Sequence, residues 1–151
     1  MITRVAAPRR IGRMETGVAF ASLEPDAQER FFSLRRELGI TSFGINQVLL
    51  RPGQRGRIHR HEHQEEVYLV ISGTLTLWVE GEPHELEEGD LARVGPDVRR
   101  QLANPHLENV LVVALGGANE HVGRDGEAFT SWRDWDGAPP QEIPLPDDEP
   151  V

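Results

Sequence analysis

The sequence contains no cysteine and no lysine, and each absence removes a class of chemistry. Without cysteine there is no disulfide, no thiolate-held iron–sulfur cluster and no thiol nucleophile. Without lysine there is no Schiff-base catalysis, and all 16 basic residues are arginines. Arginine carries a permanent charge on a planar fork that suits carboxylates and phosphates. We therefore expect any cationic group that holds a ligand to be an arginine.

The chain also lacks a long apolar run and an excess of positive charge. No segment approaches the roughly 20 apolar residues that a membrane-spanning helix needs, and the N-terminal segment has no apolar core of the kind found in signal sequences. We therefore expect a cytoplasmic protein with no membrane partner. The 25 acidic residues give a net charge of -9. This balance argues against nucleic acid as a partner, because phosphate contacts need a basic face.

A length of 151 residues suits one domain that is mainly β. One helix is predicted over residues 22–39, with Ser22 as its cap, Pro25 in its first turn and Gly39 after its end. From residue 41 short apolar runs alternate with turn residues, and "EGEP" at 80–83 reads as a hairpin connection. We predict an N-terminal arm and helix at 1–40, a barrel at 41–116, and an extension at 117–151 whose acidic, proline-rich end is mobile.

The stretch "HRHEHQEEVYLVISG", residues 59–73, carries the candidate metal ligands. His59 and His61 stand at alternate positions, so on a strand their side chains point to the same face. With Glu66 they form a set of two imidazoles and one carboxylate, which suits a divalent iron, manganese, nickel or zinc ion. His63 is an alternative partner for His61.

With its flanking glycines, this stretch resembles the first conserved motif of the cupin superfamily. Gly53 stands six residues before His59, and Gly73 stands seven residues after Glu66, as in that motif. The resemblance implies a cupin jelly-roll β-barrel in which His59, His61 and Glu66 bind a metal ion. It also implies a homodimer, since small cupins commonly pair through exposed strands.

The second cupin motif is matched less well, over the segment "GDLARVGPDVRRQLAN". Gly89 and Asn104 agree with the motif, whereas Gly95 replaces a proline and Asp97 replaces a glycine. Arg100 stands where the family has a third histidine ligand. A guanidinium cannot coordinate a metal, because it has only donors and keeps its proton. The resemblance therefore implies three protein ligands at most.

Two functions follow from this site. In the first, a metal-dependent enzyme of the oxygenase or isomerase type acts on a small anionic metabolite, and Arg100 grips the anion while Tyr68 lines the same interior. In the second, the barrel is metal-free and non-catalytic, binds or senses a small molecule, and pairs Arg100 with Glu66. The cupin fold hosts both kinds of role.

Overall fold

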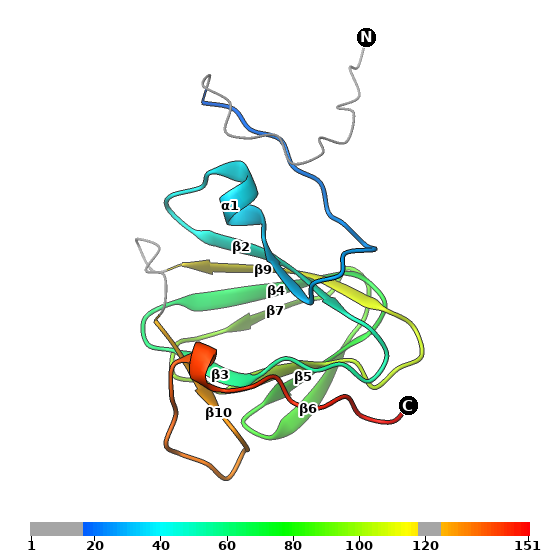
Figure 1. Cartoon of the computed structure of the whole chain (residues 1–151), viewed down its shortest axis with the longest axis vertical. Helices are drawn as coiled ribbons and strands as arrows, with labels where there is room; N and C mark the ends of the chain where they lie inside the picture. Colours follow the sequence, from blue (N-terminus) through cyan, green and yellow to red (C-terminus); the bar gives the residue numbers. More distant parts are fainter. Residues whose placement is uncertain (1–16, 118–124) are drawn as a thin grey trace.

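The computed structural model describes residues 17–117 and 125–151, which form two antiparallel five-stranded sheets. Two parts of these predictions lie outside the described residues: residues 1–16 of the arm and residues 118–124 of the extension. The two sheets stack face to face, and α1 lies outside the first sheet beside β2 (Figure 1). The prediction of a mainly β jelly-roll barrel with one helix is confirmed.

The first sheet has the order β1-β2-β9-β4-β7 and the second has the order β10-β3-β8-β5-β6. The first contains β1 (Phe31–Ser33), β2 (Gly44–Leu50), β9 (Val110–Gly117), β4 (Glu65–Ser72) and β7 (Leu91–Val94). The second contains β10 (Gly126–Phe129), β3 (Ile58–His61), β8 (Arg100–Ala103), β5 (Leu75–Val79) and β6 (Glu82–Leu86). A short 3₁₀ helix, η1 (Pro140–Glu142), follows in the C-terminal segment.

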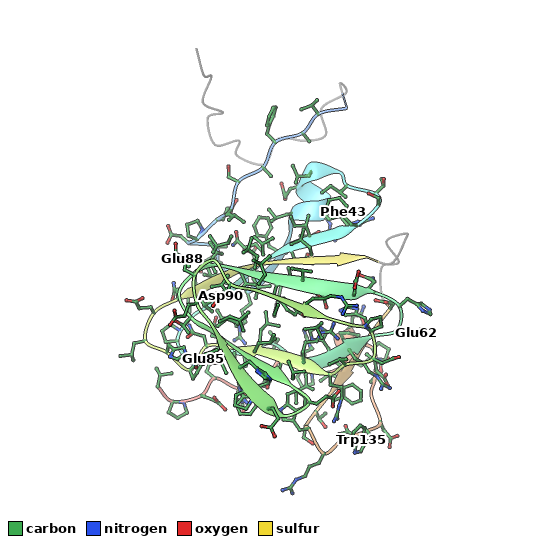
Figure 2. The ribbon with its side chains drawn as sticks, turned by 180° about the vertical axis from the view of Figure 1, so that it is seen from behind. Phe43, Glu62, Glu85, Glu88, Asp90 and Trp135 are labelled. Carbon is green, nitrogen blue, oxygen red and sulfur yellow. The ribbon has the colours of Figure 1, made fainter. Side chains whose placement is uncertain are left out.

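The core lies between the sheets because alternate residues of each strand point inward. Leu50 and Val112 of the first sheet and Leu75 and Leu102 of the second are all buried there. Figure 2 shows the side chains that fill this space, with Trp135 projecting from the loop that follows β10. The predicted hairpin is also confirmed, since β5 and β6 pair around Glu80 and Gly81.

The predicted helix is shorter than the sequence pattern suggested. Helix α1 spans only Leu34–Leu38, with Ser33 rather than Ser22 as its cap, and Gly39 ends it in the left-handed conformation. The residues before it form β1, which pairs with β2. Upstream, the side-chain amide of Gln47 donates to the carbonyl oxygen of Glu24 and accepts from its N–H. In a longer helix, the backbone N–H and C=O groups of this segment would bond to one another. Here they bond to the open edge of the sheet instead.

The C-terminal segment is extended, as predicted, and it contacts the barrel along its length. It runs beside the residues that lead into β3 (Figure 1). The Glu149 N–H donates to the Gly53 carbonyl oxygen at 2.8 Å, and the Glu149 carboxylate pairs with Arg55 at 3.1 Å. Asp148 pairs with Arg30 at 3.2 Å. The mobility of this end stays a prediction. Among the described residues, no helix is long and apolar enough to cross a bilayer.

Gly73 is a motif glycine whose substitution we expect to lower the stability. Its φ is +78°, and a Cβ added there would lie 2.3 Å from the carbonyl oxygen of Asn109. Gly73→Ala should lower the free energy of unfolding by about 2–3 kcal/mol, through left-handed strain and overpacking. Gly81→Ala, with φ +85° and no atom within 4 Å, should cost about 1 kcal/mol. Equal losses in urea unfolding would contradict the role of the Asn109 contact.

Candidate metal centre and its cavity

Strands β3 and β4 bring the three predicted metal ligands together. His59 and His61 point inward from β3, and Glu66 points inward from the start of β4. One ligand atom of each residue lies within 4.8 Å of the other two. The Nε2 atom of His59 is 3.4 Å from Oε1 of Glu66, and Nε2 of His61 contacts the same oxygen.

The outer nitrogen of each imidazole has its own partner, which fixes the orientation of the ring. Nδ1 of His59 lies 3.1 Å from the carbonyl oxygen of Arg57, so this nitrogen donates. Nδ1 of His61 lies 2.7 Å from Oδ1 of Asp125. In each ring Nε2 is therefore the nitrogen that faces Glu66. Metal-binding histidines commonly have such partners on their second nitrogen, which hold the coordinating nitrogen in place.

Asp125 is the residue of this site that the sequence did not reveal. It precedes β10, and the pairing of β10 with β3 places Gly126 opposite His61. Its buried carboxylate also accepts hydrogen bonds from the backbone N–H groups of His63 and Gln64. No motif marks this aspartate, because only the long-range pairing of β10 brings it to the histidine. Its carboxylate closes the loop between β3 and β4 over the site.

The charges of the site shift its pKa values in consistent directions. Burial alone would raise the pKa of Glu66, but hydrogen bonds from His59 and His61 hold it well below its usual value. Burial alone would lower the pKa of His61, but hydrogen bonds to Glu66 and Asp125 raise it above its usual value. Hydrogen bonds from the N–H groups near His63 and from His61 likewise outweigh burial and lower the pKa of Asp125. The site therefore favours ionised carboxylates around a central imidazole.

Arg100 lies behind Glu66, fully buried, and does not line the cavity. It sits opposite His59 in the pairing of β8 with β3, and its guanidinium is 3.6 Å from Oε1 of Glu66. Its other donors reach the carbonyl oxygens of Val98 and Val94 and the hydroxyl of Tyr68. Protein acceptors thus surround the guanidinium in the arrangement expected for an arginine–glutamate pair. Its role in binding substrate stays a prediction.

Tyr68 links Arg100 to the metal-ligand set. Its hydroxyl donates to Oε1 of Glu66 at 3.2 Å and accepts from Nε of Arg100 at 3.3 Å. Burial, followed by the charge of Glu66, raises its pKa well above the usual value. The hydroxyl therefore stays protonated and donates to the carboxylate at neutral pH. The ring lines the cavity, as the spacing along β4 predicted.

A cavity of about 350 Å³ opens beside the three ligands. Its polar lining consists of Asn46, Arg57, His59, His61, Glu66 and Tyr68, and its apolar lining includes Phe31, Val48, Leu102, Ala114 and Pro140. Such a volume and mixture are typical of sites for small molecules. The cavity lies between the two sheets, and both N-terminal β1 and C-terminal η1 contribute to its wall.

Two neighbouring side chains of this region point away from the ligand set. His63 lies in the turn between β3 and β4 with its side chain 62% exposed, away from the ligand set. Glu65 points to the outer face of its sheet, where it accepts a hydrogen bond from Arg93 at 2.6 Å. Asp97, which replaces the family glycine, has a φ of +65°. Aspartate tolerates this left-handed conformation better than most residues, so the turn survives the substitution.

The chain matches the family model Cupin_2, described as a cupin domain, over residues 46–116. Protein SchB of Streptomyces halstedii is 33% identical over 79 residues, covering 52% of this chain and 57% of SchB. Less than two thirds of that relative is therefore matched.

Solved structures agree on the fold. A cupin protein from Bacteroides fragilis is 24% identical with a TM-score of 0.60, covering 72% of this chain and 90% of that one. A sugar phosphate isomerase from a cupin superfamily, from Silicibacter pomeroyi, is 24% identical with a TM-score of 0.59, covering 67% and 65%. The motifs, the two-sheet barrel and these matches agree: the chain has the cupin fold, and its residues 46–116 match the cupin domain.

Proposed function

We propose that this cupin binds a divalent metal ion through His59, His61 and Glu66 and acts on a small anionic metabolite in the adjoining cavity. One observation carries the proposal: two Nε2 atoms and a carboxylate oxygen converge, while each imidazole is held through its other nitrogen. This donor set fits iron(II), manganese, nickel or zinc and leaves positions open for a ligand. A bound ion would act as a Lewis acid or activate oxygen.

The residues around the ligand set have separable tasks in this proposal. Asp125 orients His61, and Tyr68 and Arg100 orient Glu66 from behind. The apolar walls exclude water from the reacting end of the metabolite, which strengthens electrostatic interactions there. The similarity to a sugar phosphate isomerase makes sugar phosphates the first class of substrate to test. Isomerase activity should be assayed before oxygenase activity.

A second candidate is a metal-free barrel that binds or senses a small molecule without catalysis. The Arg100–Glu66 pair favours it, since a cation 3.6 Å from the carboxylate competes with a metal ion for the same oxygen. In that case Glu66 and the two histidines form a closed hydrogen-bonded network beneath the ligand. In both candidates we also propose a homodimer in the cytoplasm; light scattering of the purified protein tests the homodimer, and cell fractionation tests the location.

Metal content separates the two candidates. Protein purified without an affinity tag or chelator should contain close to one divalent ion per chain, and His61→Ala should contain little, because two remaining ligands bind weakly. Elemental analysis measures both. His63→Ala is the matched control and should keep the wild-type content, because His63 lies outside the ligand set. A metal-free wild type that takes up no ion on soaking would overturn the metal-dependent function and favour the second candidate.

A further inference from the structure

A second arginine, Arg57, lies in the wall of the cavity. It precedes His59 by two residues in an extended segment, which places both side chains on the same face of the chain. Among the described residues, Arg57 alone brings a permanent positive charge to the cavity lining. Sequence reasoning assigned the anion-gripping role to Arg100, because Arg100 occupies a motif position and Arg57 does not.

The hydrogen bonds of the two arginines differ in what they leave free. The guanidinium of Arg100 is surrounded by acceptors of the protein and is fully buried. Arg57 uses its Nε to donate to the carbonyl oxygen of Ile143 at 2.6 Å. No carboxylate of the described chain lies within ion-pair distance of Arg57. Its two terminal nitrogens thus remain available to a ligand.

Two neighbouring arginines on the same segment have acidic partners. Arg55 pairs with Glu149 at 3.1 Å, and Arg60 pairs with Glu127 at 2.8 Å. Glu127 lies on β10, and Glu149 lies in the C-terminal segment. The chain has a net charge of -9, yet Arg57 is half-buried beside a cavity and has no acidic partner. An anionic ligand in the cavity would supply that partner.

We propose that Arg57 is the anion anchor of the cavity, binding a phosphate or carboxylate group whose molecule reaches the His59, His61 and Glu66 set with another oxygen. This inference rests on the proposed function and deepens it by naming the ligand class and the binding residue. The contact with Ile143 ties the Arg57 side chain to the C-terminal segment, and Arg57 and Ile143 also line a neighbouring hollow. Pro140, from the same segment, lines the cavity directly.

Isothermal titration of the full chain loaded with Mn²⁺ tests the proposal. The probes are glucose 6-phosphate, gluconate and glucose, which compare a phosphate, a carboxylate and a neutral molecule. Arg57→Gln should weaken binding of the preferred anionic probe about tenfold or more, the effect of losing a charge-assisted forked contact. Its affinity for Mn²⁺ should stay within about twofold of wild type. Arg57→Lys keeps the positive charge but loses the forked geometry. Its affinity for the anionic probe should therefore lie between those of wild type and Arg57→Gln.

The control is Arg93→Gln, which removes the same charge from an outer-face side chain that is 66% exposed. It should bind every probe as wild type does. If wild type binds none of the four candidate ions, iron(II), manganese, nickel and zinc, the proposed metal-dependent function fails, and the same titrations without metal still decide the role of Arg57. Weakened anion binding in Arg57→Gln supports that role in either state. Equal anion affinity in wild type and Arg57→Gln, or no binding of either anionic probe by wild type, would overturn it.

Discussion

Arg100→Met should lower the free energy of unfolding of the metal-free protein by about 3–5 kcal/mol, the usual cost of removing one partner of a buried ion pair. Arg100 is completely buried. Its loss leaves the Glu66 carboxylate without its nearby cation and leaves the Val98 carbonyl oxygen without its donor. Guanidinium unfolding in the presence of a chelator measures the change.

The same variant should bind a divalent metal more tightly than wild type. Arg100 repels an ion at the His59, His61 and Glu66 set, and methionine removes this repulsion while filling similar space. A gain in metal affinity together with a loss of metal-free stability would show that Arg100 takes the place of an ion beside Glu66. Metal titration of wild type and variant at the same pH provides the comparison.

Two further variants separate the ion pair from general damage to the core. Arg93→Met makes the same change at an exposed arginine and should alter stability by less than about 0.5 kcal/mol. Adding Glu66→Gln to Arg100→Met should cost less than the sum of the two single changes, because the second change removes the uncompensated charge. A loss below about 1 kcal/mol for Arg100→Met would show that the pair does not stabilise the barrel.

The sequence predicted that His59, His61 and Glu66 lie together, and they do. Alternation along β3 placed His59 and His61 on one face, and the resemblance to the cupin motif supplied Glu66 as the third member. The alternation depends only on the period of a strand, so neighbouring residues suffice to predict it. The positive φ of Gly53 and Gly73 likewise agrees with their motif positions.

Predictions that depended on distant parts of the chain were less complete. The helix predicted from Ser22 begins only at Leu34, because the residues just before it pair with the edge of β2 as β1. Asp125 could not be assigned, because the pairing of β10 with β3 joins segments more than 60 residues apart. Arg57 was missed for a different reason: its significance lies in having no acidic partner, which a sequence does not display.

Asp125→Asn should weaken metal binding about 10- to 100-fold, the typical cost of changing a group that orients a metal-binding histidine. The aspartate accepts from Nδ1 of His61 at 2.7 Å and from the N–H groups of His63 and Gln64 at 3.0 and 2.9 Å. Asparagine offers one acceptor oxygen and presents an NH₂ group to the remaining donors. Titration with Zn²⁺, at a temperature where both proteins are folded, measures the affinity.

Asp125→Asn should also lower the metal-free free energy of unfolding by about 3 kcal/mol, because it removes charge-assisted hydrogen bonds that close the loop between β3 and β4. Asp134→Asn is the matched control: Asp134 accepts hydrogen bonds from Thr130 and Asp136 but has no contact with a histidine of the site. It should leave metal affinity unchanged. If Asp125→Asn bound metal as tightly as wild type, packing alone would orient His61. Loss of metal affinity in Asp125→Asn but not in Asp134→Asn would show that the Asp125 carboxylate orients His61.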